Sequence, residues 1–338
     1  MYPIIMLFSI LSVLSCTPAK YGSLEAERAS DSAADAVVYV DWDVEFGEVQ
    51  TCSDPRSAVS YREMGLDLQI DTEWFDPTAP GGHEDGPSIA VADANEDGWL
   101  DIIVARMSNG VSHIYRGLET GYADFPEILG PGRSPVFAHV NDDGVLDLLV
   151  AGPKPSWVEF SNNLDPHVRE LPSLDEGESA SVVHDWALAD FDGDASLEAL
   201  AVRTASPFGQ GVVTNDRMIE LTPDGPEIGT DWVPEDVGLR HGFDAVSFDE
   251  DGDGDIDVYM VHDHGATVGP STLLINEGEA FVDAAESCFC SISASAKGVD
   301  ITDLDRDGRP ELFVTGAPLN TLFSRIESGW VDRSDASG

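Results

Sequence analysis

The sequence predicts an all-β fold built from repeated four-stranded units. A motif with acidic residues at positions 1, 3, 5 and 9, usually with glycine at position 6 and then a short apolar run, occurs five times. Its first positions are separated by 46, 51, 59 and 54 residues. That spacing is typical of small β-sheet units arranged in a ring and not of helical repeats, so we expect a β-propeller.

Each unit shows the same order of short apolar stretches around its acidic loop. In the fourth unit one stretch enters the loop at 245–248, one leaves it at 258–261, and a third follows at 272–276. An aromatic-acidic step at 281–283 closes the unit. Four short strands separated by turn residues are typical of a propeller blade.

Five acidic loops predict five blades, and residues 37–85 predict a sixth. This segment contains apolar stretches and an aromatic-acidic step at 73–76, but Phe46 stands where its degenerate loop should carry glycine. We expect six blades in a single domain over residues 37–338, with seven blades as the alternative.

The spacing of the acidic residues predicts calcium sites in the five loops. Calcium takes six to eight oxygen ligands in flexible geometry. Side chains at positions 1, 3 and 5 of a tight loop point at one centre, while glycine at position 6 permits the positive φ that turns the chain back. The carboxylate at position 9 closes the site. Without an ion, each pair of carboxylates would repel by roughly 1 kcal/mol even in water.

An EF-hand is excluded by the residue at position 12, which should be a bidentate glutamate. That position is apolar in all five loops: Val104, Val150, Ala201, Met260 and Val314. The predicted calcium ligands, grouped by loop, are Asp93, Asn95, Asp97 and Asp101; Asn141, Asp143 and Asp147; Asp190, Asp192, Asp194 and Glu198; Asp249, Asp251, Asp253 and Asp257; and Asp303, Asp305, Asp307 and Glu311.

Two loops depart from the pattern. His139 holds position 1 of the second loop, and imidazole suits softer metals than calcium. Ala195 holds position 6 of the third loop, where a left-handed backbone costs a residue with a Cβ about 1 kcal/mol. We therefore expect up to five calcium ions, bound most weakly in the second and third loops.

The five loops and the stretches 147–153 and 311–318 resemble the FG-GAP/VCBS repeats of integrin α-chain propellers and their bacterial relatives. The resemblance covers roughly residues 86–335. It implies a β-propeller with ions in the loop between the first and second strands of a blade. It implies no particular ligand.

The N-terminus predicts export. Residues 4–14 form an apolar run of 11 residues, which is too short to span a bilayer but typical of a signal peptide. The run ends in Val13-Leu14-Ser15-Cys16, which resembles a bacterial lipobox. We expect a signal peptide over 1–16, lipidation of Cys16, a flexible acidic tether over 17–36, and a cell-envelope lipoprotein at the outer membrane or cell surface. The alternative is a secreted or periplasmic protein.

Charge limits the partners. The chain has 17 Lys and Arg against 64 Asp and Glu, a formal charge of −47. Such a surface repels phosphate backbones and anionic lipids. We expect no nucleic-acid partner, and membrane attachment only through the N-terminal lipid.

Three further cysteines, Cys52, Cys288 and Cys290, predict one disulfide in an oxidising compartment. Because Cys288 and Cys290 are too close in sequence to pair without strain, we expect Cys52 to pair with one of them.

Enzyme signatures are scarce: the chain has no phosphate-binding glycine loop, no Gly-x-Ser-x-Gly elbow and no His-Glu-x-x-His motif. His262-Asp263-His264 could hold a transition metal, but a third ligand is not evident. We expect no enzyme, but an exported calcium-binding propeller that acts as a surface-tethered binding, adhesion or scaffold module for a protein or glycan. The alternatives are a lectin-like propeller and a propeller-borne polysaccharide hydrolase or lyase. Candidate partner contacts, opposite the calcium loops, are Trp157, Phe208, His262 and His264.

Overall fold

The computed structural model describes residues 88–334, apart from 107–111, 125–129, 142, 162–163, 165, 175–180, 206–214, 239 and 279. The chain divides into two compact units, Met1–Tyr61 and Arg62–Gly338, and the described residues all belong to the second. The predicted signal peptide, Cys16, the tether, the sixth blade and Cys52 lie outside the described residues. Within the described part, no helix is both long and apolar enough to cross a membrane.

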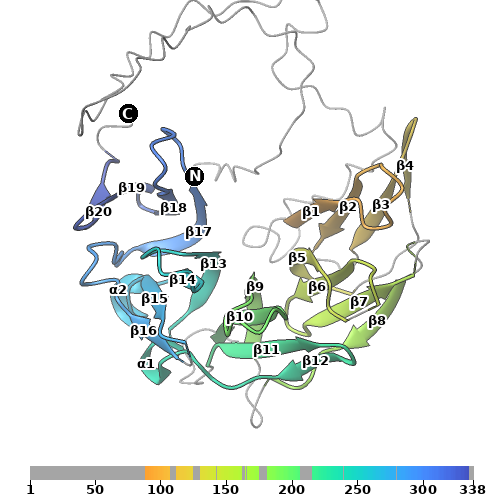
Figure 1. Cartoon of the computed structure of the whole chain (residues 1–338), viewed down its shortest axis with the longest axis horizontal. Helices are drawn as coiled ribbons and strands as arrows, with labels where there is room; N and C mark the ends of the chain where they lie inside the picture. Colours follow the sequence, from red (N-terminus) through yellow and green to blue (C-terminus); the bar gives the residue numbers. More distant parts are fainter. Residues whose placement is uncertain are drawn as a thin grey trace, which may run out of the picture. The chain divides into compact units, whose positions relative to one another are not determined.

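The described residues form five antiparallel sheets of four strands, and the strands of each sheet follow one another in sequence order (Figure 1). The first three sheets contain β1 Ser88–Ala92, β2 Asp101–Ala105, β3 His113–Leu118 and β4 Gly121–Asp124; β5 Arg133–Ala138, β6 Asp147–Ala151, β7 Ser156–Phe160 and β8 Pro166–Glu170; and β9 Ser181–Ala189, β10 Glu198–Ala205, β11 Arg217–Thr222 and β12 Gly225–Ile228. The last two contain β13 Gly242–Phe248, β14 Asp257–His262, β15 Thr272–Asn276 and β16 Phe281–Asp283; and β17 Ser295–Thr302, β18 Glu311–Ala317, β19 Thr321–Ile326 and β20 Gly329–Asp332.

Burial explains why the second strands are continuous apolar runs. All residues of β6 and all residues of β14 are buried, since these strands lie inside a sheet whose two faces are both covered by neighbouring sheets. The first strands alternate more, as in β1, where half-buried and exposed residues follow one another. The apolar stretches that the sequence places around the acidic loops coincide with these strands.

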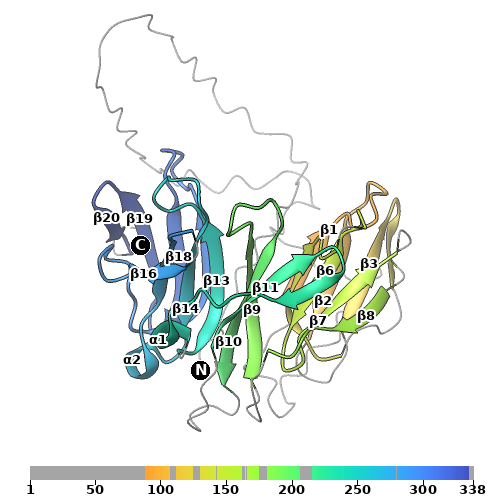
Figure 2. The same ribbon diagram turned by 60° about the horizontal axis from the view of Figure 1, so that its bottom comes forward.

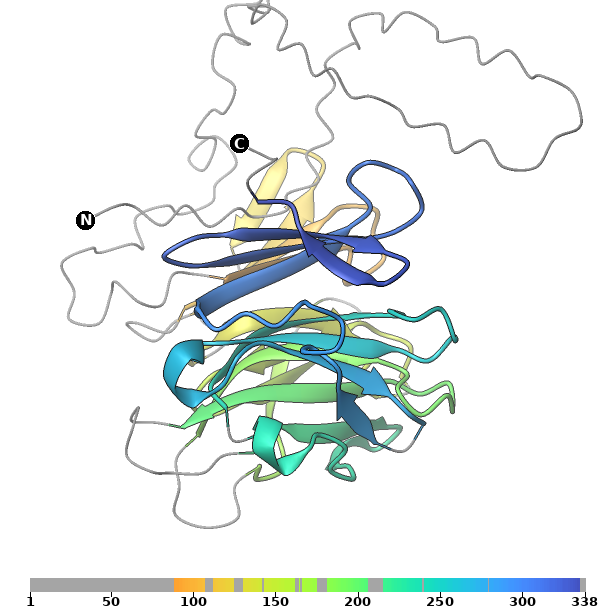
Figure 3. The same cartoon turned by 90° about the vertical axis from the view of Figure 1, so that its left-hand side faces the viewer.

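Successive sheets pack through their first strands. β1 contacts β5, β5 contacts β9, β9 contacts β13, and β13 contacts β17. Each pair of neighbouring sheets shares an apolar cluster, such as Tyr259 and Leu273 of the fourth sheet with Leu312 and Phe323 of the fifth, and Figure 3 shows these two sheets face to face. This succession is typical of propeller blades. The predicted all-β fold of four-stranded sheets is confirmed.

Two single-turn helices lie in the connections of the fourth sheet. α1 Glu235–Gly238 precedes β13, and α2 Gly265–Val268 follows β14. Because β13 and β14 are antiparallel, both helices lie at the same end of this sheet, away from its acidic loop (Figure 2).

The predicted pairing of Cys52 is wrong, because Cys288 and Cys290 form a disulfide with each other. Phe289 between them has a φ of +63°. This left-handed residue folds the chain back, so that the two α-carbons lie 5.6 Å apart, a separation that disulfides require. Cys290 N–H also donates to the Ala285 carbonyl.

Candidate metal centres

Each acidic loop joins the first strand of a sheet to the second. The first loop lies between β1 and β2, and the other four occupy the same place in their sheets. An antiparallel pair of strands forces the loop into a tight reversal, which brings side chains at alternate positions close together.

The five loops share two hydrogen bonds. The backbone N–H at position 5 donates to the side-chain oxygen at position 3 in every loop, at 3.1 Å each time. The N–H at position 7 donates to the position 5 carboxylate at 2.7–3.0 Å. The side chains at positions 3 and 5 therefore shape the turn through one oxygen each.

Position 6 is left-handed in all five loops, as predicted. The φ values are +89° at Gly98, +79° at Gly144, +75° at Ala195, +102° at Gly254 and +87° at Gly308. Ala195 thus adopts the strained conformation that its glycine counterparts adopt freely. Its N–H donates to Asp190 at 3.0 Å, as Gly98 and Gly308 donate to position 1 of their loops.

The position 9 carboxylates are buried beneath the loops. Their exposed fractions are 0–5% for the set Asp101, Asp147, Glu198, Asp257 and Glu311. Each of four of them accepts the N–H of loop position 2, at 2.7–3.0 Å. Burial raises the pKa of Asp147 and Asp257 to about 6. Position 9 therefore anchors the loop to its sheet as well as bringing a carboxylate under it.

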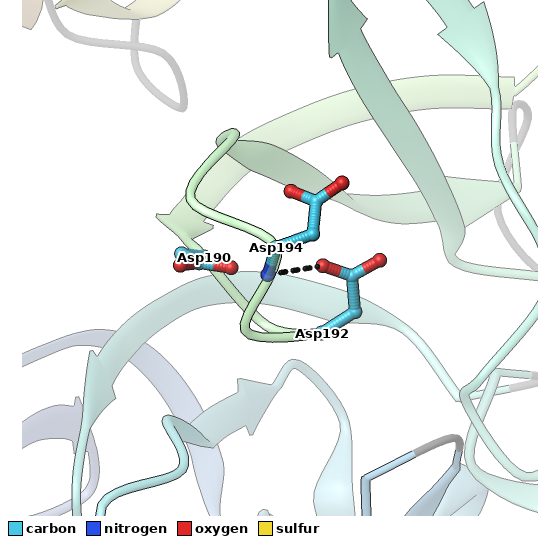
Figure 4. A group of neighbouring side chains, drawn as sticks. All are labelled: Asp190, Asp192 and Asp194. Atoms are coloured by element: carbon cyan, nitrogen blue, oxygen red, sulfur yellow. Dashed lines mark hydrogen bonds between the residues drawn. The ribbon is translucent and has the colours of Figure 1, made fainter.

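Carboxylate oxygens gather within 4.8 Å of one another in the third, fourth and fifth loops. The groups are Asp190, Asp192 and Asp194; Asp249, Asp251 and Asp257; and Asp303, Asp305 and Glu311. Figure 4 shows the first group on its turn, with the bond from Asp194 N–H to Asp192. Three loops thus bring predicted ligands together closely enough for one ion, while Asp253 and Asp307 lie outside these groups.

The third loop has an additional carboxylate that is not among the predicted ligands. Glu220 of β11 pairs across the sheet with Glu198 and lies within 4.8 Å of both Glu198 and Asp192. Burial, together with the charges of Asp192 and Glu220, raises the pKa of Glu198 to about 7. The only sequence signal was an acidic residue in the third strand, which can be placed opposite position 9 only when the strand register is known.

In the first loop an arginine occupies part of the cluster. Arg116 of β3 contacts the Asp97 carboxylate at 3.1 Å, and the Asn95 amide donates to the same oxygen at 3.0 Å. This positive charge compensates the loop in the absence of an ion.

In the second loop His139 bonds to its own loop. Its Nδ1 lies 3.1 Å from the Val145 carbonyl oxygen, so the ring donates to that carbonyl. Val145 is position 7, whose carbonyl a calcium ion would use. The imidazole thus forms a hydrogen bond with the position 7 carbonyl oxygen, which in the other loops could bind a cation.

At the opposite end of the sheets, side chains from four first strands converge. β5, β9, β13 and β17 each have a register shift near their beginning. Arg133 lies 2.8 Å from His184 Nδ1, and the His184 and Phe243 rings are 4.6 Å apart. Arg133 and Lys297 lie 5.2 and 4.3 Å from the Phe243 ring. We name these four residues the Phe243 cluster.

The Phe243 cluster combines cations, a neutral imidazole and an aromatic ring. Burial, together with the charges of Arg133 and Lys297, lowers the pKa of His184 to about 2. Lys297 also donates to Asp263 at 2.6 Å, and its side chain is 39% exposed. Hydrogen-bonding groups therefore surround an aromatic face.

Two of the predicted partner contacts are wrong. Trp157 is 5% exposed and packs in the core between the second and third sheets, and His262 is fully buried. His262 Nδ1 bonds to the Pro270 carbonyl while His264 lies at the surface. The two histidines are thus directed apart, and no metal-binding group among the described residues includes them. Phe208 lies outside the described residues.

The comparisons with known proteins agree with the repeat. The sequence profile of the FG-GAP-like repeat matches residues 249–314, which contain the fourth and fifth acidic loops. No curated protein matches the chain.

Similar solved structures include a lectin of Agrocybe aegerita that recognises non-reducing terminal N-acetylglucosamine. It is 14% identical to this chain, and the match covers 76% of this chain and 68% of the lectin chain with a TM-score of 0.43. A protein of Bifidobacterium bifidum assigned as an exo-β-1,3-galactanase has 7% identity, 76% and 74% coverage and a TM-score of 0.32. A GH43_1 enzyme of Xanthomonas citri has 11% identity, 73% and 89% coverage and a TM-score of 0.36. Likeness at this level assigns no activity to the chain.

We predicted that the protein is not an enzyme. This prediction is wrong in excluding enzymes, because two of these similar structures are glycoside hydrolases. That prediction used the absence of short catalytic motifs. Catalytic groups can instead come from separate strands that only the fold brings together.

Proposed function

We propose that this protein is an exported, calcium-loaded propeller that acts as a surface-tethered binding or scaffold module. The observation that carries the proposal is the set of five acidic loops, identical in their hydrogen bonds at positions 3, 5 and 7 and placed identically in five sheets. The FG-GAP-like repeat over 249–314 supports it independently.

The residues fit calcium. The candidate ligand atoms at positions 3, 5 and 9 are all carboxylate or amide oxygens, and calcium prefers such hard oxygen ligands. In the third loop Asp190 Oδ1 and Glu198 Oε1 are buried and have no hydrogen-bond partner among the described residues. Buried polar atoms without a partner are costly, and a bound cation would remove that cost. The ions would stiffen the loops.

The test is thermal unfolding with calcium, magnesium or chelator. At 100 times the dissociation constant, calcium adds about 2.7 kcal/mol per independent site. We expect a large rise in Tm with calcium and a smaller one with magnesium, which requires stricter octahedral geometry. The same melting curve in calcium and in chelator would contradict the proposal.

The Phe243 cluster favours a glycan as one class of partner. A sugar ring packs its apolar face on an aromatic side chain while its hydroxyls bond to nearby polar groups. Lys297, which donates to Asp263, lies 4.3 Å from the Phe243 ring. A glycan array probed with wild type and with Phe243→Ala tests this. Loss of a glycan signal in the variant, with unchanged calcium-dependent stability, would support a lectin-like function.

The same array, followed by a matrix-protein array, separates the candidate partners. Binding to proteins alone, unaffected by Phe243→Ala, would favour the adhesion function and place the contact elsewhere.

We also propose that the chain is lipidated at Cys16 and held at the cell envelope by the tether over 17–36. This rests on the apolar run over 4–14 and the lipobox-like end.

A further inference from the structure

The third loop differs from the others because a carboxylate reaches it from outside the loop. Glu220 lies on β11, the third strand of the sheet, opposite Glu198 in the strand register. Oxygens of Asp192, Glu198 and Glu220 lie within 4.8 Å of one another. A third-strand residue thus faces a loop that the first two strands form.

One of these oxygens has no partner. Glu198 is 2% exposed. Its Oε2 accepts the Phe191 N–H at 2.7 Å, whereas Oε1 is buried without a hydrogen-bond partner among the described residues. Carboxylate oxygens of Asp192 and Glu220 lie within 4.8 Å of a Glu198 oxygen, and an ionised carboxylate cannot donate to another carboxylate and repels its charge. A cation satisfies all three groups.

From these observations, and resting on the proposed calcium function, we propose that Asp192, Glu198 and Glu220 form a binding site for a hard divalent cation between the third loop and β11. With Asp190 and Asp194 this site has five carboxylates, because Glu220 joins those at positions 1, 3, 5 and 9 of the loop. The third loop therefore binds calcium tightly. This differs from the weak binding that we predicted from Ala195 at position 6.

The other sheets provide matched comparisons. The equivalent place in the fifth sheet is held by Ser324, opposite Glu311. In the second sheet, Glu159 of β7 is likewise the fourth residue of its strand, but it forms an ion pair with Arg169 at 2.5 Å. Glu159→Gln removes a third-strand carboxylate without touching the proposed site.

The first experiment is calcium titration by calorimetry of wild type, Glu220→Gln and Glu159→Gln. We expect Glu220→Gln to weaken one class of calcium site by at least about tenfold, as loss of groups around a bound metal does, while Glu159→Gln matches wild type. If the two variants bind calcium equally, the inference fails. If wild type itself binds no calcium, the proposed function fails with it.

The second experiment separates a ligand from a structural residue by the sign of its effect. In chelator, Glu220→Gln removes a repelling charge beside Asp192 and Glu198, so we expect its Tm to exceed that of wild type. In saturating calcium we expect the order to reverse. A lower Tm of Glu220→Gln in both conditions would show that Glu220 only supports the fold, and would overturn the inference.

Discussion

Asp185 of β9 and Asp244 of β13 share a hydrogen bond between two neighbouring sheets. Two carboxylates can share a hydrogen bond only when one of them carries a proton. Burial and the charge of Asp185 raise the pKa of Asp244 well above its usual range. Asp185 accepts the Ala245 N–H and Asp244 accepts the Val299 N–H, so the pair connects three successive first strands.

This pair predicts a pH dependence. Because the pKa of Asp244 is higher in the folded than in the unfolded protein, the folded state holds the proton more tightly. Stability from this group is complete below the unfolded pKa near 4 and declines as the pH rises through the folded value. Asp244→Asn can keep both the bond to Val299 and a donor to Asp185 without a charge. We expect it to raise Tm at pH 8 and to lose this advantage at pH 4.

Thermal melts of wild type, Asp244→Asn and Asp244→Ala across that pH range check the prediction. Asp244→Ala loses the bond to Val299 and should be less stable than Asp244→Asn throughout. An advantage of Asp244→Asn that does not change with pH would show that Asp244 is ionised in the fold.

The fourth and second loops provide a matched pair for calcium. Asp253 accepts the Asp255 N–H at 2.9 Å and Asp143 accepts the Val145 N–H at 2.8 Å, so alanine removes the same hydrogen bond from each. We expect equal losses of stability in chelator. In calcium at 100 times the dissociation constant, Asp253→Ala should cost up to about 2.7 kcal/mol more, because His139 already bonds to the Val145 carbonyl. Equal losses in calcium would refute the ranking.

Arg116 predicts a gain of function in the first loop. Its contact with Asp97 is partly exposed and contributes little to stability, but it places a positive charge where a cation would bind. Arg116→Gln should therefore tighten calcium binding at this loop severalfold in calorimetric titration. Arg240→Gln is the control, since its partners Asp236 and Asp283 belong to no acidic loop. Unchanged or weaker binding in Arg116→Gln would exclude competition between arginine and ion.

Cys16 predicts the location. The net charge of −47 opposes binding to anionic lipids. Membrane attachment would therefore depend on the lipid at this residue. Cys16→Ser should leave a folded protein with unchanged calcium binding in the soluble fraction, measured by fractionation after a salt wash. Retention of the variant in the membrane fraction would place the anchor elsewhere.

The sequence by itself determined the repeating architecture. The spacings within each loop are local: two residues separate positions 1, 3 and 5, and eight residues separate positions 1 and 9. They act through the backbone geometry of a few neighbouring residues. Positive φ at Ala195 could therefore be predicted from its position alone, and the strands around each loop from the apolar stretches on either side of it.

Only the tertiary structure decided what faces each loop from another strand. Strand register places Glu220 opposite Glu198, and the third strand brings Arg116 to Asp97; a one-residue shift in either strand would turn those side chains to the other face of the sheet. The convergence of Arg133, His184, Phe243 and Lys297 depends on contacts between four sheets. The Cys288–Cys290 bond depends on a left-handed phenylalanine. Contacts between residues far apart in the chain cannot be predicted from local sequence spacing, because they depend on strand register and on the packing of neighbouring sheets.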